Sequence, residues 1–128
     1  MFRVRSAQMK RLGVPVRTRF VAMMCAYLRE YFPRWVSDLD EPALEAWVGS
    51  ALDKADRYGV RTEPEAAQLI LLFIVLGLDA DETLPWVEEI LSDDDLVAIG
   101  KVRALVRRAR EHEVDGLDQA LVFPEMEG

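Results

Sequence analysis

The stretch that decides the fold is residues 62–77, which read TEPEAAQLILLFIVLG. Eight consecutive apolar residues precede the closing Gly77, and a glycine commonly ends a helix. Thr62 and Glu65 have the spacing of a helix capping box, and the proline between them is tolerated in a first turn. A helix over about 63–76 would have no polar face, so other elements must enclose it. We therefore expect it to be the central helix of an all-α bundle.

The rest of the chain also has the periodicity of helices, and no alternating strand pattern longer than four residues occurs. Capping residues, prolines and glycines set the expected boundaries. Besides the apolar helix, the expected helices cover about 6–12, 15–32, 40–58, a short stretch ending near 91, and 95–113. The fold class is therefore a single-domain bundle of five to six helices over residues 1–113. Residues 114–128 follow as a tail that is either docked or frayed.

Apolar residues at intervals of three and four predict which helix faces are buried. On the helix over 15–32, the expected core stripe is Phe20, Met24, Tyr27, Leu28 and Tyr31. On the helix over 40–58, it is Leu44, Val48, Ala51, Leu52 and Ala55. The last helix should bury Leu96, Ile99, Val102, Leu105, Val106 and Ala109. Its outer face should carry Lys101, Arg103, Arg107, Arg108 and Arg110.

The net charge of −7 hides an asymmetry between the two ends of the chain. Residues 1–35 hold eight basic residues and one acid, a balance of +7, whereas residues 36–128 hold eight basic and 22 acidic residues, a balance of −14. Either the two parts pack together, with long cationic side chains covering the edges of the core, or one pole binds a partner of opposite charge. Arg3 and Arg5 are candidate contacts of the basic pole. Nucleic acid is disfavoured, because no basic run is interleaved with aromatics and the net charge repels phosphates.

An acidic segment runs from Asp79 to Asp95 and contains no basic residue. Its acids are Asp79, Asp81, Glu82, Glu88, Glu89, Asp93, Asp94 and Asp95. The last three should lie where the final helix begins, near its positive end. A calcium site is disfavoured, because the segment lacks the third ligand and the glycine of an EF-hand loop. The segment is then either a solvated acidic face or a surface that binds a partner.

The candidate partner-binding residues in this segment are Asp79, Asp81, Glu82, Pro85 and Trp86. Tryptophan often anchors protein interfaces, which favours that role for Trp86. The other interpretation of Trp86 is a core residue that wedges the short helix against the apolar helix.

No catalytic or metal-binding pattern is visible, so we expect no enzyme, no cofactor and no metal. His112 is the only histidine and Cys25 the only cysteine, and Cys25 lies among apolar residues as a buried thiol would. Glu88 and Glu89 are adjacent, so they point about 100° apart on a helix, a poor geometry for shared acid–base work. Residues 1–21 lack the apolar core of a signal peptide, and the apolar run reaches only about 15 Å. A cytoplasmic protein without a membrane span is expected.

Several short motifs resemble a set of small all-helical bacterial proteins encoded near type VI secretion genes, beside spike, PAAR-like and effector genes. The matching residues are 1–9 (MFRVRSAQM), 19–20 (RF), 28–29 (LR), 31–33 (YFP), Ala55, 58–60 (YGV), 76–77 (LG), Asp79, 85–86 (PW) and 90–91 (IL). The resemblance implies a cytoplasmic accessory role and supplies no catalytic residues. Residues 13–15 (GVP) interrupt what is in that family a more continuous first helix.

Three functions remain open at this point. The first is a non-enzymatic chaperone or loading adaptor that binds a secreted effector or its carrier. The second is an immunity protein that occludes a cationic site on a toxin. The third is a small-ligand-binding or enzymatic helical domain, which would require a pocket with converging polar groups. The oligomeric state cannot be read from the sequence.

Overall fold

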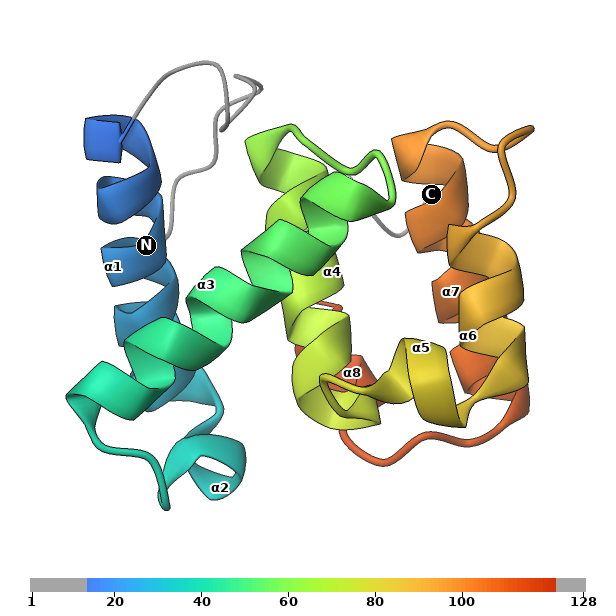
Figure 1. Cartoon of the computed structure of the whole chain (residues 1–128). Helices are drawn as coiled ribbons and strands as arrows, with labels where there is room; N and C mark the ends of the chain where they lie inside the picture. The colour runs from blue at the N-terminus through green and yellow to red at the C-terminus, as the bar shows by residue number, and fades with distance from the viewer. Residues whose placement is uncertain (1–13, 122–128) are drawn as a thin grey trace.

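In a computed structural model, residues 14–121 form an all-helical domain without a β-strand (Figure 1). The helices in this range are α1 (Val14–Tyr31), α2 (Pro33–Val36), α3 (Glu41–Arg57), α4 (Glu63–Leu76), α5 (Ala80–Thr83), α6 (Pro85–Leu91), α7 (Ala98–Glu111) and α8 (Leu117–Ala120). The predicted all-α class is confirmed. The structure describes residues 14–121 only, so the expected helix over 6–12 and the residues after 121 lie outside the described part.

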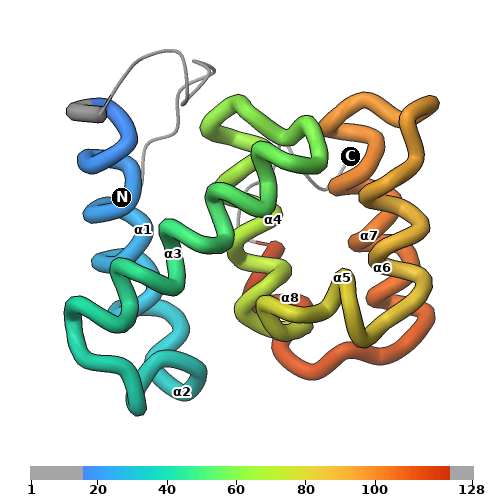
Figure 2. The backbone as a smooth tube through the Cα atoms, in the orientation of Figure 1, coloured from blue at the N-terminus to red at the C-terminus, as the bar shows by residue number. Residues whose placement is uncertain are grey.

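Helix α4 has the predicted bounds, and every residue from 66 to 73 is buried. Its last three residues, 74–76, are only partly buried. The main contacts of α4 are with α3, α7 and α8, whereas α1 packs mainly against α2 and α3. The helices therefore pack in succession, α1 on α3, α3 on α4 and α4 on α7 (Figure 2).

The predicted N-terminal caps of α3 and α4 differ in their hydrogen bonds. The Asp40 carboxylate accepts a hydrogen bond from the Ala43 amide at 2.9 Å and caps α3 as expected. At α4 the Thr62 hydroxyl instead donates to the Glu65 carboxylate, and neither side chain bonds the backbone as a capping box requires. The predicted core stripe of α3 is buried at every position.

On α1 the predicted stripe is correct at Phe20, Met24 and Leu28, which are all buried. Tyr27 is only partly buried, and the prediction was wrong for Tyr31, which is 46% exposed. Tyr31 is the last residue of α1, and its ring packs against Tyr27 at 4.7 Å rather than entering the core.

Helix α7 corrects two predictions. Lys101, expected on the outer face, is buried, and its ammonium donates to the Tyr58 carbonyl at 2.7 Å. The helix also starts at Ala98 and not at Asp95. The Asp93 carboxylate accepts from the Asp95 amide at 2.9 Å, so these acids form a turn before the helix. Of the six predicted core residues four are buried, namely Val102, Leu105, Val106 and Ala109, whereas Leu96 and Ile99 are partly buried.

Helix α8 packs against α4 and α7. Leu117, Ala120 and Leu121 are buried there. The buried Gln68 amide on α4 donates to the Ala120 carbonyl at 2.6 Å. The segment after α7 therefore contributes to the core as far as it is described.

We expect Gly116→Ala to destabilise the domain by about 1–3 kcal/mol more than Gly59→Ala, because it forces an overpacked contact. The two glycines have nearly the same backbone conformation, with φ of +83° and +82°. A Cβ at Gly116 would lie 2.5 Å from a ring carbon of Trp35, whereas nothing lies within 4 Å of one at Gly59. Urea denaturation of both variants measures the difference, and equal losses would contradict the close approach of Trp35 to Gly116.

Candidate functional site

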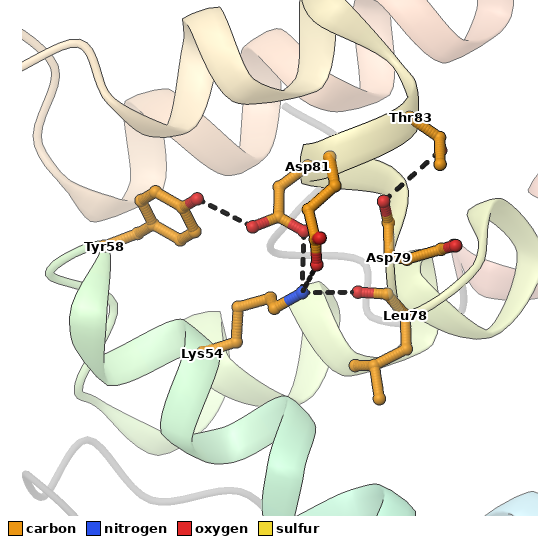
Figure 3. Close-up of polar contacts among 7 residues, drawn as sticks. Lys54, Tyr58, Leu78, Asp79, Asp81 and Thr83 are labelled. Carbon is orange, nitrogen blue, oxygen red and sulfur yellow. Dashed lines mark hydrogen bonds and ion pairs between the residues drawn. The ribbon is translucent and has the colours of Figure 1, made fainter.

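The most connected polar cluster in the described residues joins α3, α5 and the turn between α4 and α5 (Figure 3). The Lys54 ammonium contacts the Asp81 carboxylate at 2.6 Å and donates to the Leu78 carbonyl at 2.7 Å. The Tyr58 hydroxyl donates to the other Asp81 oxygen at 2.7 Å. Lys54 and Tyr58 are one helical turn apart, so both reach the same carboxylate from one face of α3.

Burial and hydrogen bonding set the protonation states in this cluster. Burial raises the pKa of Asp81, but the hydrogen bonds from Lys54 and Tyr58 and the charge of Lys54 outweigh it, so the pKa lies below its ordinary value. Burial and the hydrogen bond to Asp81 raise the pKa of Tyr58 to about 12. At neutral pH the cluster therefore holds an ion pair and a neutral tyrosine, an arrangement that fastens α5 to α3.

The remaining carboxylates of the acidic segment are exposed. We call them the acidic surface: Asp79, Glu82, Glu88, Glu89, Asp93, Asp94 and Asp95. They lie on α5, α6 and the two adjoining loops. Within the described part of the chain, the only ion pair in this set joins Glu82 to Lys54 at 3.9 Å. Asp81, by contrast, is inside the domain, and its counter-charge comes from α3.

Trp86 is an interior residue at one edge of this surface. It is 9% exposed, and its ring stacks on His112 with centroids 4.9 Å apart and planes 7° from parallel. The Arg108 guanidinium lies 5.8 Å from the Trp86 ring. The tryptophan is thus a core residue that packs α6 against the end of α7.

Of the predicted partner contacts, the structure brings Asp79, Glu82 and Pro85 to the exposed surface, whereas Asp81 and Trp86 are buried. Arg3 and Arg5 lie outside the described residues.

Sequence reasoning missed Lys54, Tyr58 and Lys101 as members of the polar interior. A signal was present: Lys54 adjoins the buried Ala51 and Ala55, and Lys101 is one turn before Leu105. A lysine inside an apolar stripe is a candidate for a buried, bonded cation.

Metal and membrane features are absent from the described range. Within residues 14–121 no three histidine, cysteine or acidic side chains gather closely enough to hold a metal ion. Across the same residues, no helix has the length and apolarity needed to cross a bilayer.

We expect Cys25 of the folded protein to resist thiol reagents at neutral pH. Its side chain is buried, and burial together with Glu41 and Glu45 raises the pKa of the thiol to about 11. The reactive thiolate is therefore scarce and shielded. Labelling with a chromogenic disulfide should become rapid only in urea, and rapid labelling of the native protein would contradict a structural thiol.

No protein-family model, curated protein or solved structure matches this chain.

Proposed function

We propose that this domain is a non-enzymatic protein-binding module whose acidic surface receives a cationic partner. The partner class that fits the sequence resemblance is a secreted effector or its carrier, which the chain would accompany as a chaperone or loading adaptor. The observation that carries the proposal is the acidic surface itself. It exposes seven carboxylates, and only one of them, that of Glu82, has an ion-pair partner among the described residues.

Physical considerations support this assignment. Clustered like charges repel one another, and a cationic partner relieves that repulsion while being steered toward the surface. The Lys54–Asp81 ion pair holds α5 against α3, and so holds the backbone that carries the neighbouring Asp79 and Glu82. A preorganised surface loses less conformational entropy when it binds.

The test begins by finding the partner through pull-down from the native host and mass spectrometry. Its association rate is then measured at several salt concentrations with the wild type, with Asp79→Asn/Glu82→Gln, and with the control Asp38→Asn/Glu45→Gln. Both double variants remove two exposed carboxylates, but Asp38 and Glu45 lie near the start of α3. We expect slower association and a weaker salt dependence only for the first. Equal rates for the two double variants would refute the acidic surface as the docking site.

Co-expression with the identified partner separates the two roles that such a module could have. An adaptor raises the solubility or export of the partner and leaves its toxicity intact. An immunity protein instead rescues cells from the partner. Rescue would therefore overturn the adaptor role and leave the docking surface in place.

A further inference from the structure

The domain buries two lysines in different ways. Lys54 has the Asp81 carboxylate as its counter-charge. Lys101 is 6% exposed, yet the only acceptor of its ammonium among the described residues is the Tyr58 carbonyl at 2.7 Å. An ammonium has three donors, and a buried charge without an opposite charge carries a large desolvation cost. Lys101 is therefore a buried cation that has no carboxylate within ion-pair distance among the described residues.

A cavity of about 430 Å³, open to solvent on one side, lies beside Lys101. It forms where the end of α3 meets the end of α6 and the loop into α7, segments that Figure 2 places together. Its lining residues are Arg57, Tyr58, Gly59, Arg61, Leu91, Ser92, Asp94 and Lys101. Gly59 keeps one wall open, because nothing lies within 4 Å of where its Cβ would be.

The charges of this lining are mainly positive, although the chain as a whole is acidic. Three cations, Arg57, Arg61 and Lys101, face one carboxylate, Asp94. Arg61 already forms an ion pair outside this lining, in which its Nε lies 2.9 Å from a carboxylate oxygen of Asp56. Arg57 and Lys101 have no carboxylate within ion-pair distance among residues 14–121. Two unneutralised cations, one of them buried, therefore border the same cavity.

We propose that this cavity binds a phosphate group, either as inorganic phosphate or as part of a small phosphorylated molecule. Arginine offers two parallel donors and lysine a compact point charge, and together they recognise phosphate oxygens. A phosphate carries about −1.5 to −2 charges at neutral pH, which matches the two unneutralised cations. The volume exceeds that of phosphate alone and falls in the range of sites for small organic ligands.

The phosphate site does not rest on the proposed protein-binding role, although the two surfaces share one residue. Asp94 belongs both to the acidic surface and to the cavity wall, where its carboxylate opposes the bound anion. A substitution of Asp94 should therefore have the opposite effect to a substitution of Arg57 or Lys101, because removing the carboxylate should strengthen phosphate binding.

The test is calorimetric titration of the full chain at low ionic strength with inorganic phosphate and, separately, with phenyl phosphate. We expect saturable binding, weakened at least about tenfold by Arg57→Gln and by Lys101→Met, since each substitution removes a charge-assisted hydrogen bond to the phosphate. Asp94→Asn should bind more tightly. The matched control is Arg103→Gln, which removes an exposed arginine of α7 outside the cavity and should bind like the wild type.

The outcomes separate the two ligand sources. Tighter binding of phenyl phosphate indicates a phosphorylated organic ligand, and equal binding indicates phosphate itself. Loss of binding in Lys101→Met is accepted only if circular dichroism shows a folded variant. Arg57 is exposed, so Arg57→Gln keeps the proposal testable in any case. The proposal is overturned if neither probe shows saturable binding, or if Arg57→Gln behaves like Arg103→Gln.

Discussion

Replacing Ile70 with aspartate is expected to abolish the cooperative unfolding transition of the domain. Ile70 is fully buried at the middle of α4, where α3, α7 and α8 pack around the helix. A carboxylate there would be removed from water, and this costs several kcal/mol in addition to the lost apolar burial. Domains of this size have a total free energy of unfolding of about 5–15 kcal/mol. Thermal melts followed by circular dichroism measure the outcome.

The control is Val97→Asp, which introduces the same charge at a residue that is 71% exposed and precedes α7 as its N-cap. Aspartate is favoured at that position, so we expect unchanged or slightly higher stability. A transition of Ile70→Asp close to that of the wild type would show that α4 is not enclosed.

The second large effect is expected for Asp81→Ala, which should lower the free energy of unfolding by about 3–5 kcal/mol. The side chains of Lys54 and Asp81 are 9% and 8% exposed, so the variant leaves a buried ammonium without its partner. Asp79→Ala removes an exposed carboxylate two residues away and should cost little. Equal losses in urea for the two variants would disprove the buried ion pair.

A third variant separates the ion pair from the packing around it. In Lys54→Met/Tyr58→Phe/Asp81→Leu all three polar groups are replaced by apolar ones of similar size. Such replacements are often neutral or stabilising, so we expect much of the loss in Asp81→Ala to be recovered.

The same pair predicts how stability changes with pH. The pKa of Asp81 in the folded protein lies below its ordinary value, which is about 3.9 in unfolded chains. Its stabilising contribution is therefore complete above that value and is lost as the pH falls through the lower, folded pKa. We expect the free energy of unfolding to fall more steeply in acid for the wild type than for Asp81→Ala, as measured by urea denaturation at several pH values.

Much of the fold could be predicted because apolar residues recur at intervals of three and four along long helices. Helices α3 and α4 begin and end within a residue or two of the expected positions. Tyr31 keeps the interval of its stripe but falls where the chain turns into α2, so periodicity alone misplaces it. Helix α5 is a single turn of four residues, too short to show any period.

The candidate site was less predictable, because it depends on contacts between distant segments. Asp79, Asp81 and Glu82 look alike in the sequence, and only the fold shows which of them is buried. The partner of Asp81 is Lys54, 27 residues earlier, and their contact requires α5 to fold back onto α3. Likewise, Lys101 lies 43 residues from the carbonyl that it binds. No local pattern encodes such pairings.

The docking of α8 on α4 has a consequence for folding during synthesis. Gln68 on α4 and the Ala120 carbonyl that it binds are separated by 52 residues. At synthesis rates of about 5–20 residues per second, roughly 3–10 s pass between the making of α4 and the making of the helix that covers it. During that interval the part of α4 that α8 later buries remains exposed on the nascent chain. Slow translation, or a chain cut before Leu117, would prolong this exposure and favour aggregation of the nascent protein.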